Sequence, residues 1–383
     1  FHVQPVCAST RASLLTGYYH RELAIAGAGG PARAGIPRWA RTMPETLRGA
    51  GYATAAFGKW HLSYRRGFLP PDRGFQEWLG FYGGSSPYSL DEINRRSERF
   101  LFDGQQPFKP KPGHTTDLFA DRALAFIERQ SSDRPFFLYL AFNAPHTPIW
   151  RPENPVFSAR PDWLQRVRAQ GVEHSSSLDY MALVSHMDER IGHILDLLET
   201  KELDRDTLVI FLSDNGEDLE ASGSFPGPGS NGVFRGGKGS VFEGGTRVPL
   251  LMQWPALIEP GTQVDSFTMM IDLWPTVREL IGVHPSHGQA LKPLSGKSLV
   301  PLLSGGTPHV GTEGREGWFL FPLTGLALRQ PPWKLIRHAD GSEELYNLRD
   351  DPVEASPANK DQADRVQSMS RRIDQYLGIS ERP

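Results

Sequence analysis

The chain is poor in cysteine, in net charge and in long apolar runs, and each shortage excludes a class of protein. Its 383 residues contain one cysteine, which excludes a disulfide framework and a cysteine-based zinc site. Lysine and arginine number 41 and aspartate and glutamate 44, so the net charge of −3 provides no field that attracts nucleic acid or an anionic membrane. The longest apolar run, 136–142, is far shorter than the ~20 residues of a membrane span. Any bound anion must therefore be held by a local group of cations.

The rest of the composition is that of a folded globular protein, and its apolar pattern predicts an α/β fold. Hydrophobic residues make up 39% and charged residues 22% of the chain. Short, nearly all-apolar runs at 53–57, 136–142 and 208–212 are typical of strands buried on both faces of a mostly parallel sheet. Helix-period segments lie between them at 118–127, 180–198 and 267–281. We predict a doubly wound, mostly parallel sheet flanked by helices.

The pattern changes near residue 305. Closely spaced strand candidates follow at 317–321, 326–328, 333–336 and 343–346, and a helical apolar stripe follows at 366–377. We therefore predict two domains, an α/β domain over 1–305 and a smaller C-terminal α+β subdomain over 306–383, built from an antiparallel sheet and one helix.

Polar residues follow each strand candidate of the larger domain. In an open parallel sheet, ligands bind beyond the carboxyl ends of the strands. If the three strands are parallel neighbours, the side chains that follow them converge on one edge, together with a lysine from the Gly-rich segment 221–245. These residues are Lys59, His61, His146, Asp214, Asn215 and Lys238.

These residue types suit one kind of ligand. Lysines and imidazoles suit a tetrahedral oxyanion, whereas adjacent Asp and Asn oxygens suit Ca²⁺ or Mg²⁺. The segment from Cys7 to Gly17 adds a short helix, with Ser9 as its predicted N-cap and Gly17 as its end. Cys7 would lie just ahead of that helix, where free N–H groups favour an anion, and Arg11 would point to the same place. Together these features indicate hydrolysis of a sulfate or phosphate ester.

The same segments resemble the motifs of the type I, formylglycine-dependent sulfatases of the alkaline phosphatase superfamily. Cys7-Ala-Ser-Thr-Arg11 with its tail to Gly17 resembles the first motif, although Ser9 stands where proline is commoner, and Gly58-Lys-Trp-His-Leu62 resembles the second. Four further segments resemble later blocks of the family and occur in the family's order: 144–148, 213–217, 236–249 and 344–352. The likeness covers nearly the whole chain.

The resemblance implies a role for each candidate residue. A formylglycine-generating or sulfatase-maturating enzyme would convert Cys7 to formylglycine, whose hydrate attacks sulfur, and Arg11 would hold that hydrate. Lys59 and Lys238 would bind sulfate oxygens. His146 would hydrogen-bond the leaving oxygen and help bind the substrate, and His61 would take the proton of the nucleophile. The metal ligands, for Ca²⁺ or Mg²⁺, would be Asp214, Asn215 and the modified Cys7.

The resemblance also implies a missing part. Sulfatases carry two consecutive aspartate ligands after their first strand, upstream of the cysteine motif, and nothing precedes Phe1 here. We therefore expect this chain to be N-terminally truncated, to lack a central strand and to bind metal weakly on its own. The family suggests a periplasmic or secreted location.

Two other functions remain open at this point. The first is a phosphoesterase of the same superfamily, and the second is an inactive binding relative. The resemblance implies an aryl or carbohydrate sulfate as the substrate, and the candidates for stacking on sugar rings are Tyr18, Tyr19, His20, Tyr82 and Trp150. The remaining histidines form no recognisable group, and for His114 a surface loop is favoured over the alternative that it lines the substrate cleft.

Overall fold

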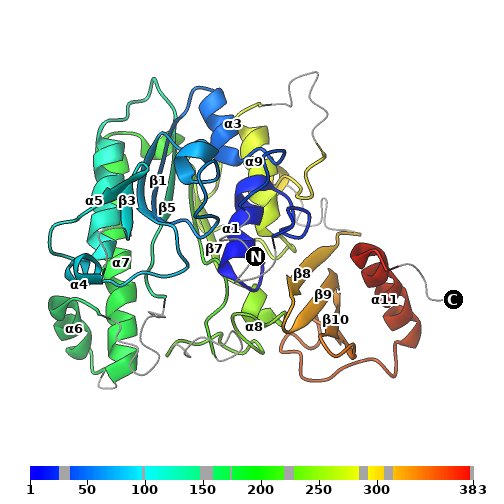
Figure 1. The fold of residues 1–383 in the computed structure, drawn as a ribbon. Helices are drawn as coiled ribbons and strands as arrows, with labels where there is room; N and C mark the ends of the chain where they lie inside the picture. Colours follow the sequence, from blue (N-terminus) through cyan, green and yellow to red (C-terminus); the bar gives the residue numbers. More distant parts are fainter. Residues whose placement is uncertain are drawn as a thin grey trace.

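The computed structural model describes residues 1–25, 35–96, 100–146, 158–172, 175–219, 228–283, 292–305 and 314–379. It confirms an α/β fold with a C-terminal antiparallel sheet (Figure 1). Within these residues, no helix is both long and apolar enough to cross a membrane.

The larger part of the molecule is built on a five-stranded sheet in the order β4-β3-β2-β1-β5. The central strand β1 (Ala53–Lys59) runs parallel to β2 (Glu77–Phe81) and to β5 (Phe136–Ala141). The hairpin of β3 (Leu101–Asp103) and β4 (Gln106–Phe108) adds an antiparallel edge. Thus the runs predicted at 53–57 and 136–142 are parallel neighbours.

Helices cover both faces of this sheet (Figure 1). On one face, Ala55 and Phe57 of β1 pack with α5 (Thr115–Glu128) and with the end of α7 (Ser175–Thr200). On the other face, Ala56 packs with Ala12 and Leu15 of α1 (Cys7–Thr16). Behind α1 lie α3 (Met43–Gly49) and α9 (Leu273–Leu280). The alternation along β1 is the two-residue period of a strand buried on both sides.

The third predicted strand pairs differently from the prediction. β6 (Val209–Leu212) forms an antiparallel pair with β7 (Leu250–Gln253), in a sheet of its own within the described residues. The only strand partner of β5 in the described part of the chain is β1. The expectation that all three strands are parallel neighbours is therefore wrong for β6, because an apolar run predicts a buried strand without identifying its partner.

The C-terminal sheet has the order β11-β10-β9-β8 and is antiparallel throughout. Its strands are β8 (Gly317–Phe321), β9 (Gly325–Gln330), β10 (Trp333–His338) and β11 (Glu343–Asn347), and α11 (Ala363–Leu377) packs on one face. Its core is continuous with the N-terminal segment through Val3 and with the segment before α9 through Met269.

Shorter elements connect these layers. They are α4 (Leu90–Arg96), α6 (Pro161–Arg168), α8 (Glu243–Thr246), α10 (Val300–Leu303) and the 3-10 turns η1 (Pro70–Arg73), η2 (Asp204–Asp206) and η3 (Met270–Asp272). The helix predicted over 267–281 begins only at Leu273, since Pro275 lacks an N–H and belongs in a first turn.

Candidate active site

Cys7 is the first residue of α1. Val6 is the N-cap, and Gly17 ends the helix with a left-handed φ of 72°. The prediction of Ser9 as N-cap is therefore wrong: Ser9 is the third helical residue, and its buried hydroxyl has no hydrogen-bond partner in the described structure. The first turn of a helix has no internal acceptors for its N–H groups, so serine and proline both fit the backbone at this position.

The end of β1 turns back toward Cys7. A Cβ on Gly58 would lie 2.0 Å from the carbonyl oxygen of Ala141, so only glycine allows β1 and β5 to approach this closely. Trp60 packs in the core, while His61 has a left-handed φ of 56°. Its Nδ1 lies 3.1 Å from Cys7 Sγ. The backbone of this turn therefore delivers an imidazole to the predicted nucleophile position.

The surroundings of Cys7 favour an anion. Burial alone would raise the pKa of the thiol, but the charges of Lys59 and His61 and the hydrogen bond from His61 outweigh burial and hold the pKa well below its ordinary value. Lys59 is itself almost fully buried, and burial lowers its pKa although Cys7 and Asp214 oppose the effect. Both pKa values are thus lowered, that of Cys7 by the nearby cations and that of Lys59 by burial, as expected for a thiol and a lysine held together in one water-poor site.

Arg11 joins the end of β1 to the end of β6. Its Nε donates to Asp214 Oδ2 at 2.8 Å, and its Nη2 lies 2.7 Å from the same oxygen. Its Nη1 donates to the carbonyl oxygen of Lys59 at 2.9 Å and contacts the Tyr139 hydroxyl at 3.1 Å. Burial raises the pKa of the Asp214 carboxyl, but Arg11 and Lys59 outweigh it, and the pKa lies well below its usual range. Asp214 is therefore a charged carboxylate.

Asn215 carries an oxygen that is suited to a metal ion. Its Oδ1 is buried without a hydrogen-bond partner among the described residues, although its Nδ2 donates to the carbonyl oxygen of Gly216 at 2.8 Å. A buried carbonyl oxygen without a donor costs free energy unless a ligand satisfies it. Next to the charged Asp214, this oxygen fits Ca²⁺ or Mg²⁺, which prefer carboxylate and amide oxygens.

His146 and Lys238 form the other side of the group. Lys238 Nζ lies 3.0 Å from His146 Nε2 and 3.5 Å from Asp218 Oδ2. Because an ammonium group only donates, Nε2 of His146 is the acceptor. The same loop carries a second cation, Arg235, but its Nη1 donates to the Tyr346 hydroxyl at 3.0 Å. Lys238 is thus the loop cation that reaches the site histidine.

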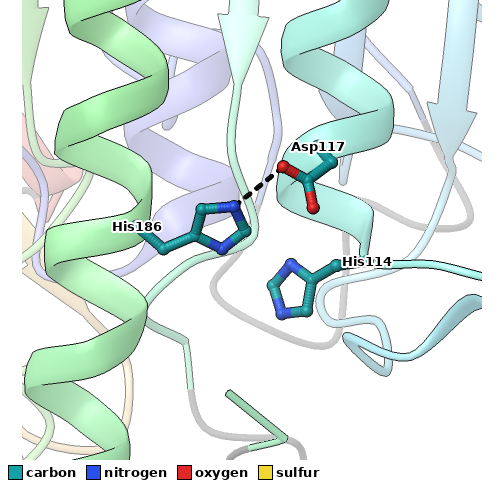
Figure 2. A group of neighbouring side chains, drawn as sticks. All are labelled: His114, Asp117 and His186. Carbon is teal, nitrogen blue, oxygen red and sulfur yellow. Dashed lines mark hydrogen bonds and ion pairs between the residues drawn. The ribbon is translucent and has the colours of Figure 1, made fainter. Parts of the chain in front are cut away.

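A second group of ligand-type side chains was not recognised in the sequence. Figure 2 shows His114 and Asp117 at the start of α5 beside His186 of α7, and their ligand atoms lie within 4.8 Å of one another. His186 Nε2 is 2.8 Å from Asp117 Oδ1, and Arg160 donates to Asp117 Oδ2 at 2.8 Å. Both carboxylate oxygens are therefore already paired with protein groups.

His114 is also fully engaged. Its Nδ1 accepts from the N–H of Thr116 and caps α5, and its Nε2 lies 3.2 Å from the carbonyl oxygen of Ser158. The ring stacks on Tyr88, whose hydroxyl donates to the carbonyl oxygen of His146 at 2.8 Å. The prediction that His114 lies in a surface loop is wrong. We interpret this group as internal support for the His146 turn, since a metal would have to displace these bonds.

The predicted sugar-stacking residues are not available for that role. Tyr18, Tyr19 and Tyr82 are buried in the apolar cores. Trp150 lies outside the described residues. Aromatic rings this well buried pack against protein, so this prediction is wrong for the three tyrosines.

Comparison with known families gives two matches. Residues 1–283 match the family model described as Sulfatase, and residues 229–378 match the model described as N-sulphoglucosamine sulphohydrolase, C-terminal. The human N-acetylgalactosamine-6-sulfatase is 32% identical over 325 residues, covering 79% of this chain and 58% of the relative. Mouse steryl-sulfatase is 30% identical over 411 residues, covering 86% of this chain and 61% of the relative. The chain thus spans about three-fifths of the length of these curated relatives.

Solved structures show the same fold. A crystal structure of Ps i-CgsB in complex with k-i-k-neocarrahexaose is 26% identical, with a TM-score of 0.82, and the match covers 100% of this chain and 84% of that one. A phosphonate monoester hydrolase of Agrobacterium radiobacter shares the fold at 20% identity and a TM-score of 0.64, covering 99% of this chain and 87% of that one. The family match extends over most of the chain and includes every candidate site residue. The chain belongs to the sulfatase family.

Proposed function

We propose that this protein is a sulfuric ester hydrolase that acts on a carbohydrate sulfate. The observation that carries the proposal is the placement of Cys7 at the N-terminus of α1, 3.1 Å from His61 and within the electrostatic influence of Lys59. This is a nucleophile position with a proton acceptor and a buried cation beside it. In the hydrolysis of a sulfate ester the proton acceptor would activate the nucleophile, and the cation would offset negative charge on the sulfate group and the leaving oxygen.

The residues around Cys7 fit its conversion to formylglycine. When hydrated, that group supplies a hydroxyl nucleophile and a second hydroxyl that can later expel sulfate. Cys7 Sγ stands in for those oxygens, so His61 Nδ1 is placed to hold and remove a proton there. A formylglycine-generating or sulfatase-maturating enzyme would be the partner that performs the conversion.

The cations of the site would bind the sulfate group and position the nucleophile. Lys59 is buried and would bind a sulfate oxygen next to the nucleophile. Lys238 would bind a second sulfate oxygen. His146, whose Nε2 lies 3.0 Å from Lys238 Nζ, would hydrogen-bond the leaving oxygen and help bind the substrate. Preorganised donors of this kind typically contribute a factor of about 10²–10³ each to the rate. Arg11 is held at four points and would fix the geometry between nucleophile and metal ligands.

Asp214 and Asn215 would hold the divalent metal, together with the modified Cys7. A bound Ca²⁺ or Mg²⁺ would add positive charge next to the nucleophile and so favour its deprotonated form. Ca²⁺ takes six to eight oxygen ligands, so water, substrate or further carboxylates must complete the set around these residues.

Two comparisons support a carbohydrate substrate. The relatives with about 32% identity are named N-acetylgalactosamine-6-sulfatase, and the structure with a TM-score of 0.82 was solved with a neocarrahexaose. The experiment is to coexpress the chain with a formylglycine-generating enzyme and to assay 4-nitrophenyl sulfate, 4-nitrophenyl phosphate and sulfated galactosamine side by side. We expect sulfate esters to be hydrolysed and Cys7→Ala to abolish the activity.

The same experiment separates the alternatives. A clear preference for the phosphate ester would replace the sulfatase with a phosphoesterase. Mass spectrometry of the peptide that contains Cys7 reports whether the thiol has become an aldehyde. Complete conversion without turnover of any ester, but with binding of sulfated glycan, would identify a binding protein.

A further inference from the structure

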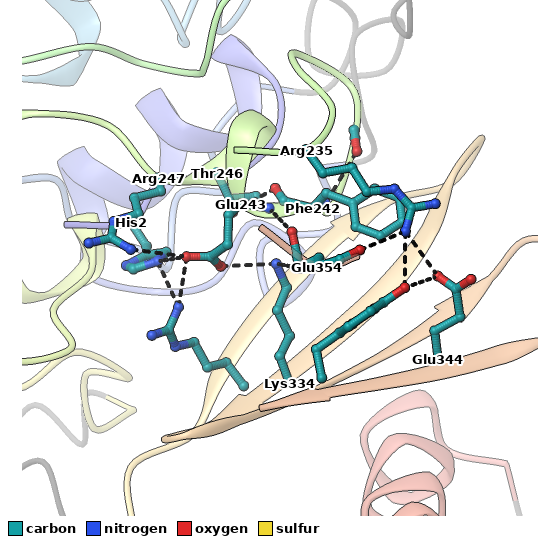
Figure 3. Close-up of polar contacts among 12 residues, drawn as sticks. His2, Arg235, Phe242, Glu243, Thr246, Arg247, Lys334, Glu344 and Glu354 are labelled. Carbon is teal, nitrogen blue, oxygen red and sulfur yellow. Dashed lines mark hydrogen bonds and ion pairs between the residues drawn. The ribbon is translucent and has the colours of Figure 1, made fainter. Parts of the chain in front are cut away.

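A buried group of charges links the C-terminal sheet to the candidate active site. Figure 3 shows the Glu243 carboxylate, at the start of α8, among His2, Lys334 and Glu354. Lys334 Nζ of β10 lies 3.0 Å from Glu243 Oε1 and 2.8 Å from Glu354 Oε1, and Arg329 Nη1 of β9 donates to Glu243 Oε2 at 2.9 Å. Glu243, Lys334 and Glu354 are at most 1% exposed.

The charges in this group balance. Two carboxylates face two cations, the buried Lys334 and the partly buried Arg329, while Arg247 lies farther out, with its nearest nitrogen 3.9 Å from Glu243. His2 Nε2 lies 3.1 Å from Glu243 Oε2, and burial lowers the pKa of His2 to about 3, which leaves it neutral. A buried ionic group of this kind gives little net stability for its cost, and its short contacts hold the segments that carry it in one geometry.

Glu243 lies where three site segments meet. Its N–H donates to Glu354 Oε2 at 2.6 Å, which ties the first turn of α8 to the chain after β11. The next residues approach the metal-ligand turn so closely that a Cβ on Gly216 would lie 1.8 Å from the carbonyl oxygen of Gly244. Gly216 directly follows Asp214 and Asn215. A shift of α8 therefore displaces the backbone of that turn.

The other two segments carry Lys238 and Cys7. Gly239, next to Lys238, donates its N–H to the carbonyl oxygen of Pro5 at 2.8 Å and accepts from the Thr324 hydroxyl at 2.7 Å. Val3 donates to the carbonyl oxygen of Thr246 at 2.8 Å. The segment that leads into Cys7 is thus bonded both to α8 and to the lysine loop.

We propose that Glu243 and Lys334 are positioning residues for the sulfate site, and that the C-terminal sheet sets the geometry of Lys238 and Cys7 through them. This inference rests on the proposed function. Neither residue touches the candidate reacting groups directly. Lys334 neutralises the charge of Glu243. Glu243 in turn fixes the backbone of α8, which contacts the Asp214 turn and the segment that leads into Cys7, and that segment is bonded to the loop of Lys238.

The test compares two ion groups on the same strand. The double variant Lys334→Met/Glu354→Gln removes one charge of each sign from the Glu243 group, so that no net charge is left buried. The matched control is Arg337→Met. Arg337 lies three residues after Lys334 on β10, so its side chain is on the opposite face of the sheet. There it pairs with Glu343 and Asp374, at 2.7 and 2.6 Å. Arg329→Gln, at a less buried position, serves if the double variant does not fold.

Two measurements are made on the formylglycine-converted chain. We expect the double variant to lower kcat/KM for 4-nitrophenyl sulfate at least tenfold and to speed hydrogen exchange in peptides from 1–7 and 235–246. Arg337→Met should lower the melting temperature yet keep kcat/KM and those exchange rates within twofold of wild type. Unchanged kcat/KM or unchanged exchange in a folded variant would overturn the proposal. A wild-type chain that hydrolyses no sulfate ester would instead refute the proposed function, and the exchange data would still decide whether the sheet fixes these segments.

Discussion

His20 offers a quantitative test of how this fold responds to acid. Its side chain is about 1% exposed, and neither ring nitrogen has a hydrogen-bond partner in the described structure. Burial and the nearby Arg21 charge lower its pKa to about 4. In the unfolded chain a histidine has a pKa of about 6.5. The unfolded state therefore takes up a proton first as the pH falls.

The size of the effect follows from these two pKa values. Above pH 6.5 the imidazole is neutral in both the folded and the unfolded state, so its protonation does not change the free energy of unfolding. As the pH falls from 6.5 toward 4, stability is lost, and at pH 5 the loss reaches about 2 kcal/mol from this side chain alone. His20→Leu removes the titrating group. We expect the stability of the variant relative to wild type to be about 2 kcal/mol greater at pH 5 than at pH 8.

The assay is urea unfolding at both pH values, followed by tryptophan fluorescence and circular dichroism, which must give coincident transitions. His193→Gln, which removes an exposed histidine from α7, is measured alongside as the surface control. A His20→Leu difference that changes by less than about 0.5 kcal/mol between pH 5 and pH 8 would refute the reasoning.

Three further predictions concern the site. His61→Asn keeps a residue that tolerates a left-handed φ, so the melting temperature should stay close to wild type while kcat falls by about 10²–10⁴ through loss of the base. In Arg11→Lys, the single ammonium group cannot bond Asp214 and the Lys59 carbonyl at the same time. We expect denaturant titration to show a loss of about 1.5–3 kcal/mol in the free energy of unfolding. The value of kcat/KM should also fall, and added metal should not restore it. Asn215→Ala should raise the Ca²⁺ concentration for half-maximal activity by about 10–100-fold, and chelation should abolish activity in both proteins; equal Ca²⁺ dependence in calcium titrations would contradict the assignment of Asn215.

The parts of the fold that were predictable are those whose signal is local. The apolar runs at 53–57 and 136–142 became β1 and β5, and the apolar stripe at 180–198 became most of α7. The partner of β6 was not predictable, because strand pairing depends on the whole chain. The start of α1 was misplaced by three residues, from Val6 to Ser9 as the N-cap, since a serine within the first turn resembles an N-cap. The boundary at 305 stays a prediction, as residues 306–313 are not described.

The site shows the same division. Lys59 and His61 could be chosen as candidates because they lie at the end of a recognisable strand and just beyond it. The His114, Asp117 and His186 group could not, since its members come from two helices and meet only through tertiary packing. Likewise, Glu243 and Lys334 are far apart in sequence, and neither position reveals its partner. Short-range spacing therefore supplied the candidate site residues, whereas the groups that support them depend on long-range packing.

The bonds of His2 have a consequence for the order of events during synthesis. Its partners Glu243 and Arg329 are 241 and 327 residues later in the chain. Until those residues have been synthesised, His2 lacks both of these partners, so these bonds cannot yet hold the segment next to Cys7. In the finished molecule, Cys7 is only 3% exposed. If Cys7 is converted as proposed, the modifying enzyme would therefore reach the thiol more readily before these contacts form than after.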